Sequence, residues 1–309
     1  MSTAADRSET PTHVCLITFQ NLPFAPLAVG ASVQKTLNDL TEAGLLLEFF
    51  YLQDQGGESF AAQLPDESEI FVESELEAAA AELRNFLTGA ESASGASHPT
   101  WIHVPCDIDL DDEDALSPLL AELRQVRSID NATVILTAVE GTCPVDLTPF
   151  ESLLWESEIR VPCWVFDREV AHGRHQAIVG SQQLLQCLSG AQPAVDLRKI
   201  LGRGVFHADE SPLASPASAD ADTESDEQTD DLLVLQTDQA MAVRNSRFLF
   251  VQHLADADDD RPIGIDPPSA LYVKPEDVWN VNDVRAEFLA DSEALQDVLL
   301  RVQSRREDH

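Results

Sequence analysis

Two short apolar segments of the sequence each end in polar residues that could contact a ligand. Residues 13–19 (HVCLITF) are followed by Gln20 and Asn21, and residues 133–137 (TVILT) are soon followed by Glu140. Both segments have the length and β-branched composition of strands buried on both faces. In an open α/β sheet, ligands gather at the carboxyl ends of such strands. The amide and carboxylate oxygens could hold a polar or cationic group there, so this strand-end edge is the first candidate site.

Further apolar segments predict the elements that would position these residues. We expect strands at 13–19, 45–52, 100–104, 133–137 and 161–166, and helices at 32–43, 75–87, 115–126 and 177–188. Helices alternate with the buried strands, which is typical of βαβ units and a mainly parallel sheet. The polar residues 53–73 and 88–98 predict connecting loops.

The chain changes character after residue 207. Residues 211–231 combine Ser, Pro, Ala, Asp and Glu without periodicity, which predicts a flexible acidic linker. A hairpin at 240–251 and a helix at 292–302 then predict a small α+β unit. We therefore expect four parts: a disordered N-terminus at 1–12, an α/β domain at 13–207, an acidic linker at 208–231, and a C-terminal unit at 232–309 packed on the main domain.

The order and spacing of these segments resemble the sulfatase family. The matching segments are KTLNDLTEAG (35–44), DNATVILT (130–137), ESLLWESEIRVP (151–162), CWVF (163–166), AMAVRNSRFLFV (240–251) and ALYVKPEDVWNVN (270–282). Together they span nearly the whole chain. The resemblance implies an alkaline-phosphatase-like, sulfatase-like α/β fold, with a mainly parallel sheet flanked by helices and a small C-terminal antiparallel sheet and helix.

The resemblance also implies which residues stand at the family's metal-ligand positions. These are Gln20, Asn21, Val139 and Glu140, where family members carry carboxylates and an amide or histidine. Ca²⁺ takes about six to eight oxygen ligands and binds more tightly as carboxylates are added. One carboxylate with two amides predicts a weak site at best, so we expect no metal cofactor unless an unrecognised Ca²⁺ site survives. The simpler interpretation is that the three polar side chains bond strand-end backbone and water.

The family's nucleophile motif, Cys-X-Pro/Ala-Ser-Arg, has no counterpart in this chain. In family members its Cys or Ser is oxidised to formylglycine, and the polar residues 53–73 stand where the motif is expected. Cys143 and Pro144 resemble its start but lie in another segment and lack the Ser and Arg. The cysteines, Cys15, Cys106, Cys143, Cys163 and Cys187, show no CxxC spacing and are interpreted as reduced and buried. We therefore expect no catalytic residue.

Other polar groups have simpler structural interpretations. A cluster after the 161–166 strand could hold an anion, but a solvated loop explains it without a partner nucleophile; it consists of Asp167, Arg168, His172, Arg174 and His175. His103 alternates with Trp101 and is interpreted as a hydrogen-bonded sheet histidine. The acidic residues 109–114 indicate a solvated loop before a helix rather than a Ca²⁺ site.

The charge balance restricts the possible partners. The chain has 55 acidic and 19 basic residues and a formal net charge of −36. Nucleic acids and anionic membranes require a positive surface, so neither is an expected partner. The N-terminal residues lack the basic and apolar regions of a signal peptide, which favours a cytoplasmic location. A basic protein could bind the acidic linker.

Three functions remain open on these observations. The first is a catalytically inactive, sulfatase-like pseudoenzyme that acts by binding or regulation. The second is an active hydrolase of sulfuric or phosphoric esters that uses a non-standard site. The third is an acidic interaction or scaffold protein.

Overall fold

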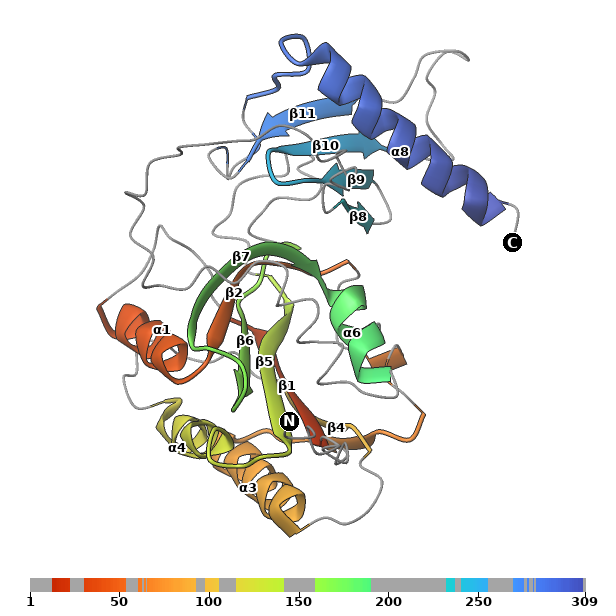
Figure 1. Cartoon of the computed structure of the whole chain (residues 1–309). Helices are drawn as coiled ribbons and strands as arrows, with labels where there is room; N and C mark the ends of the chain where they lie inside the picture. Colours follow the sequence, from red (N-terminus) through yellow and green to blue (C-terminus); the bar gives the residue numbers. More distant parts are fainter. Residues whose placement is uncertain are drawn as a thin grey trace, which may run out of the picture.

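The computed structural model contains two β-sheets, shown in Figure 1. It describes residues 13–22, 31–53, 61–62, 64, 66–92, 98–105, 115–141, 159–189, 232–236, 240–254, 269–274, 277, 280 and 282–307. The first sheet has seven strands in the order β3-β4-β1-β5-β6-β2-β7, and the second has four in the order β11-β10-β9-β8. None of the helices in these ranges is both long and apolar enough to cross a membrane.

The first sheet alternates with helices along the chain. Its strands are β1 (His13–Asn21), β2 (Leu45–Tyr51), β3 (Glu69–Val72), β4 (Thr100–Val104), β5 (Ala132–Glu140), β6 (Cys163–Asp167) and β7 (Gly173–Gly180). The helices are α1 (Ala31–Ala43), α3 (Leu76–Ser92), α4 (Ser117–Val126) and α6 (Ser181–Ser189). Strand β6 runs antiparallel to both of its neighbours, whereas every other pairing in this sheet is parallel. The predicted mainly parallel α/β sheet is therefore confirmed.

The helices cover the two faces of the first sheet. Helices α1, α3 and α4 lie along one face and α6 lies on the other (Figure 1). Strand β5 is buried along its length up to Val139, so both of its faces lie in the core. This is the burial expected for a central parallel strand with near-continuous apolar composition. The strand-end edge is thus supported by a rigid core.

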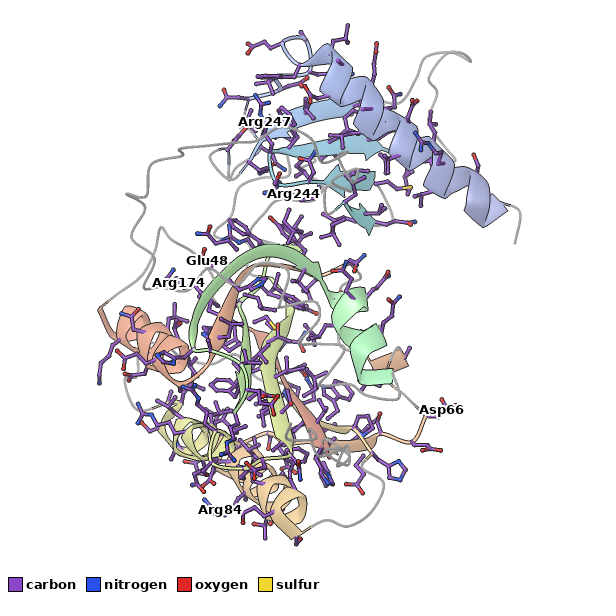
Figure 2. All side chains as sticks on the ribbon, viewed as in Figure 1. Glu48, Asp66, Arg84, Arg174, Arg244 and Arg247 are labelled. Carbon is purple, nitrogen blue, oxygen red and sulfur yellow. The ribbon has the colours of Figure 1, made fainter. Side chains whose placement is uncertain are left out.

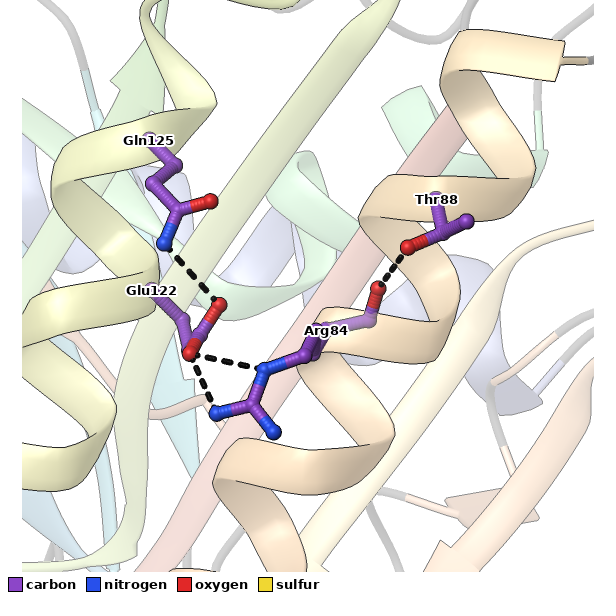
Figure 3. Close-up of polar contacts among 4 residues, drawn as sticks. All are labelled: Arg84, Thr88, Glu122 and Gln125. Carbon is purple, nitrogen blue, oxygen red and sulfur yellow. Dashed lines mark hydrogen bonds and ion pairs between the residues drawn. The ribbon is translucent and has the colours of Figure 1, made fainter.

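A buried carboxylate joins helices α3 and α4 (Figure 3). The Arg84 guanidinium donates to Glu122 Oε1 from Nε at 3.0 Å and from the terminal nitrogen at 2.6 Å. Gln125 Nε2 donates to the other carboxylate oxygen at 3.3 Å. Glu122 is only 4% exposed, so these donors replace the water that an exposed carboxylate would bind.

The second sheet packs against the first on one face and against helix α8 (Leu289–Glu307) on the other. Its strands are β8 (Leu233–Gln236), β9 (Ala240–Arg244), β10 (Phe248–His253) and β11 (Ser269–Val273). Alternate residues face opposite ways, as the strand period of two requires. In β10, Leu249 and Val251 face Tyr51 and Ile159 of the main domain, whereas Phe250 faces Leu299 of α8.

A hairpin turn at 245–247 connects β9 and β10, as predicted. The Asn245 side-chain oxygen accepts hydrogen bonds from the backbone N–H groups of Arg247 and Phe248 at 2.9 and 2.7 Å. This is the local side-chain bonding that favours Asn in turns. The antiparallel C-terminal sheet with a terminal helix is therefore confirmed.

Three predicted boundaries were wrong. Residues 69–72 form strand β3 rather than a loop, because they pair with β4. Helix α3 continues to Ser92, so the predicted linker over 88–98 begins in helix. Residues 177–180 belong to β7 and not to the following helix, because pairing with β2 extends to Gly180.

Several predicted segments lie outside the described residues. They are the N-terminal 1–12, the acidic run at 109–114, Cys143 with Pro144, and the acidic linker at 208–231. The domain boundaries therefore stay predictions.

Candidate functional site

The carboxyl ends of β1 and β5 lie side by side at one edge of the first sheet. The two strands pair in parallel, with Phe19 opposite Ala138 and Asn21 opposite Glu140. Gln20 and Val139 each directly precede this last pair. The structure thus brings the four residues expected at the strand-end edge to neighbouring backbone positions.

The side chains at this edge differ in what they can offer a ligand. Val139 is completely buried and has no polar side-chain atom. Gln20 and Glu140 are partly exposed, and Glu140 carries the charge. The edge therefore presents the amide of Gln20 and the carboxylate of Glu140. The backbone of Asn21 pairs with that of Glu140.

These residues do not fit a hard divalent cation. Ca²⁺ requires about six to eight oxygen ligands in close convergence. Val139 provides none, and in the described ranges no three His, Cys, Asp or Glu side chains come together as a metal site would need. The family's metal chemistry consequently has no support from Gln20, Val139 and Glu140.

The cysteines that the structure describes in the core cannot act as nucleophiles. Cys15 and Cys163 are unpaired and completely buried. Burial raises the pKa of both thiols well above the ordinary value, because a thiolate loses its hydration there. A hydrogen bond from Thr137 opposes this rise in the pKa of Cys163 but is the smaller effect. Both thiols stay protonated, and their predicted role as reduced, buried cysteines is confirmed.

A hydroxyl and a histidine meet near the candidate edge, between β1 and β4. Trp101 Nε1 donates to Thr18 Oγ1 at 2.8 Å, and the same hydroxyl is hydrogen-bonded to His103 Nδ1 at 2.9 Å. The rings of Trp101 and His103 stack with centroids 5.3 Å apart. A hydroxyl bonded to an imidazole is the arrangement of an activated nucleophile. Thr18 is completely buried, however, so no substrate can reach it.

His103 is therefore a hydrogen-bonded sheet histidine, as predicted from its alternation with Trp101. Burial lowers its pKa, and a hydrogen bond with the backbone of Thr18 partly opposes that shift. The lowered pKa favours the neutral imidazole at pH 7.

The prediction of a solvated loop over 167–175 was wrong at both ends. Asp167 ends β6 and is buried; its carboxylate accepts hydrogen bonds from Thr133 Oγ1 at 2.5 Å and from the Glu169 backbone at 2.7 Å. His175 is buried because β7 pairs with β2. Of the five cluster residues, only Arg168, His172 and Arg174 are exposed. The five side chains therefore do not converge on one anion.

The remaining arginines of the cluster have acidic partners. Arg168 pairs with Asp130, and Arg174 lies 2.9 Å from Glu48 (Figure 2). Their positive charges are already opposed by carboxylates, which leaves little attraction for a bound anion.

The sequence reasoning did not single out one buried charge. Arg244, at the end of β9, is 1% exposed and faces the main domain, where its Nε donates to the Tyr51 hydroxyl at 3.2 Å (Figure 2). Arg244 ends the run AMAVR, and its even-numbered position shares the face of Ala240 and Ala242. That alternation was the signal that could have found it.

Comparisons with known proteins agree with this architecture. No model of a known protein family and no curated protein matches the sequence. Among solved structures, the "putative sulfatase yidJ" from Bacteroides fragilis superimposes with a TM-score of 0.59 over 97% of this chain and 96% of that one, at 9% identity. This chain has a sulfatase-like fold.

Two further solved structures match over a similar share of the chain. A 2-O GAG sulfatase gives a TM-score of 0.53 at 9% identity, covering 97% of this chain and 94% of that one. The protein Ps i-CgsB, in complex with k-i-k-neocarrahexaose, gives 0.59 at 10% identity, covering 94% and 92%. At such identities the likeness concerns the fold, so the chemistry depends on the residues of this chain.

Proposed function

We propose that this protein is a non-catalytic member of the sulfatase-like fold that binds a polar or cationic ligand at the ends of β1 and β5. The observation that supports this most is the register that sets Asn21 opposite Glu140, with the buried Val139 beside them. The edge lies at the carboxyl ends of β1 and β5, where α/β sheets bind ligands. Its polar side chains, Gln20 and Glu140, could bind a ligand by hydrogen bonds.

Electrostatics argue against an anionic ester as the ligand. Hydrolysis of a sulfate ester requires positive charge to stabilise the developing anion. Glu140 is negative, and the chain as a whole carries −36. Two like charges about 4 Å apart repel by about 4 kcal/mol at an effective dielectric constant near 20. A neutral polar or cationic group avoids this repulsion and could donate hydrogen bonds to the side-chain oxygens of Glu140 and Gln20.

An assay of ester hydrolysis tests the absence of catalysis. Aryl sulfate and aryl phosphate would be offered to the wild-type protein with Ca²⁺, Mn²⁺ or Mg²⁺ added. We expect no turnover above that of the buffer with metal. Turnover that Glu140→Gln abolishes and Glu287→Gln retains would show an active hydrolase, because Glu287 is an exposed carboxylate remote from the edge in sequence.

Calorimetric titration tests the binding half of the proposal separately. Putrescine serves as a cationic probe and glucose as a neutral polar probe. We expect at least one of them to bind the wild-type protein and to bind Glu140→Gln several-fold more weakly, with Glu287→Gln unchanged. Equal affinity for all three proteins, or no binding of either probe, would refute a ligand site at Glu140.

A further inference from the structure

Strand β3 stands at one end of the strand order of the first sheet, two strands from β1. It pairs with β4 on one side, through bonds such as Glu69 N–H to Pro99 O (2.9 Å) and Glu73 N–H to His103 O (2.8 Å). Because these alternate residues bond inward, the backbone polar groups of Ile70 and Val72 point outward. In the part of the chain that the structure describes, no strand pairs with this outer side.

Two of the three exposed residues of β3 are apolar, and the third is Glu69. Ile70 and Val72 are 52% and 61% exposed, although both are β-branched residues of the kind that sheets usually bury. Edge strands normally carry charges or prolines that prevent pairing with other chains. In β3 the outward-pointing backbone groups belong to the β-branched residues Ile70 and Val72, which favours pairing with another strand.

A cavity of about 350 Å³ lies beside this edge, between the sheet and α3. Glu69 and Phe71 line it from β3, and Glu82 and Phe86 line it from α3. His13, the first residue of β1, also lines it, so the cavity is at the opposite end of the strands from Asn21 and Glu140. A cavity lined by two carboxylates and two phenyl rings suits a basic side chain, whose aliphatic stem can pack on the rings while its charged end meets the carboxylates.

The surroundings of the edge are strongly acidic. The sequence has no lysine or arginine between Lys35 and Arg84. The segment 66–82, which contains β3, carries the carboxylates Asp66, Glu67, Glu69, Glu73, Glu75, Glu77 and Glu82. Figure 2 shows Asp66 at the outer margin of the main domain, on the far side from α1. A partner that docks here must therefore be basic.

We propose that the outer edge of β3 binds an extended, basic segment of a partner protein as an additional strand. Backbone hydrogen bonds to Ile70 and Val72 supply affinity, and alternate side chains of the segment supply specificity. Neighbouring strands lie about 4.8 Å apart, so a lysine or arginine on the α3 side of the added strand reaches the cavity between Glu69 and Glu82. This surface is separate from the strand-end site, and none of its residues belongs to the segment 208–231.

A second copy of this chain is a poorer occupant of the same edge. Pairing two β3 strands would bring Glu69 and Glu73 of each copy close to the same carboxylates of the other. Like charges directly across a strand pair are destabilising. Each copy also carries a net charge of −36, which opposes association over longer distances.

A pair of labelled peptides tests strand addition in the full-length protein. The first is a capped peptide of alternating lysine and valine, and the second replaces two of its valines with proline at the same charge. Binding would be followed by fluorescence anisotropy at about 0.15 M salt. We expect the valine peptide to bind at least about tenfold more tightly than the proline peptide, because proline cannot complete the ladder. Equal affinities would mean attraction by charge alone and would overturn the proposal.

Variants of β3 locate the binding. Val72→Pro removes an outward N–H and should reduce affinity for the valine peptide to that for the proline peptide, whereas Val72→Thr keeps the N–H and should bind like the wild type. Glu69→Gln should weaken binding several-fold. Circular dichroism melting checks folding, and if Val72→Pro fails to fold, the two-peptide comparison still decides. Unchanged affinity in a folded Val72→Pro, or a wild-type dimer that Val72→Pro dissociates in sedimentation, would refute a basic-partner site.

Discussion

The guanidinium of Arg244 donates a hydrogen bond to the Tyr51 hydroxyl across the seam between the two sheets, with 3.2 Å between Nε and the oxygen. Both side chains are almost completely inaccessible, at 1% and 0% exposure. The guanidinium also donates to Phe248 O at 3.4 Å, and its central carbon lies 5.8 Å from the centroid of the Tyr51 ring. A buried cation is therefore solvated by a phenol, a carbonyl and a ring face, which positions the second sheet against β2.

Tyr51→Phe should destabilise the protein because it leaves one donor of the buried Arg244 without its acceptor. A hydrogen bond to a charged group contributes about 1.5–3 kcal/mol, and we expect a loss of that size in the free energy of unfolding measured in urea. Tyr272→Phe is the matched control, since Tyr272 is only partly buried, and it should change stability by less than about 0.5 kcal/mol. Equal effects of the two substitutions would contradict a role for the Tyr51 hydroxyl.

Gly180→Ala should also destabilise the seam. An added Cβ would lie 2.3 Å from Gln53 Oε1 and 2.5 Å from a methyl group of Leu233. Gln53 bridges the sheets, because its Oε1 accepts from Gln182 N at 3.0 Å and its Nε2 donates to Val234 O at 3.1 Å. Displacing that side chain should cost about 1–3 kcal/mol by urea unfolding.

Gly89→Ala, the same chemical change at another position, should increase stability instead of decreasing it. Gly89 lies inside α3 with nothing within 4 Å of an added Cβ. Alanine is the better helix former by about 1 kcal/mol, so this variant should be more stable than the wild type. Destabilisation by Gly89→Ala similar to that by Gly180→Ala would contradict the local explanation of both.

Arg84→Ala should destabilise the contact between α3 and α4. The buried Glu122 would keep the bond from Gln125 but lose both bonds from the guanidinium. A buried acceptor left without partners costs about 1–3 kcal/mol. Arg124→Ala on the exposed side of α4 is the control and should have little effect. Thermal unfolding followed by circular dichroism compares them, and a shift no larger than that of Arg124→Ala would count against the ion pair.

Stability should fall as the pH decreases below about 6.5, in part because of His103. Burial lowers the pKa of His103, so the unfolded chain takes up a proton at higher pH than the folded protein does. The stabilising contribution of the neutral imidazole is complete above the unfolded pKa and is lost as the pH falls toward the folded pKa. His13, whose pKa burial also lowers, acts in the same direction.

His103→Gln isolates this contribution, because His13 and the many carboxylates are the same in both proteins. The difference in unfolding free energy between wild type and His103→Gln should shrink from pH 7.5 to pH 5, as measured in urea at about one-unit steps of pH. A difference that stays constant over this range would exclude His103 as a source of the pH dependence.

The strand-end edge was predictable because its signals are local. Residues 13–19 and 133–137 are continuous apolar runs, and such runs indicate central strands wherever they occur. Strand β3 was missed because its four residues, EIFV, alternate weakly within an acidic segment. Its strand conformation depends on pairing with β4, about thirty residues away in the sequence. The reversed direction of β6 likewise follows from its neighbours, because a strand of given composition can pair in either direction.

The sequence alone determined the class of the fold, the extreme negative charge, and the identity of the side chains at the ends of β1 and β5, because each of these depends on residue type and local period. The tertiary structure decided which residues meet: Asn21 with Glu140, Thr18 with His103, and Tyr51 with Arg244. It also decided that Val139 and Thr18 are buried while Ile70 and Val72 are exposed. Burial of a given residue is set by segments distant in the sequence, so only the folded chain could distinguish a core position from an exposed edge.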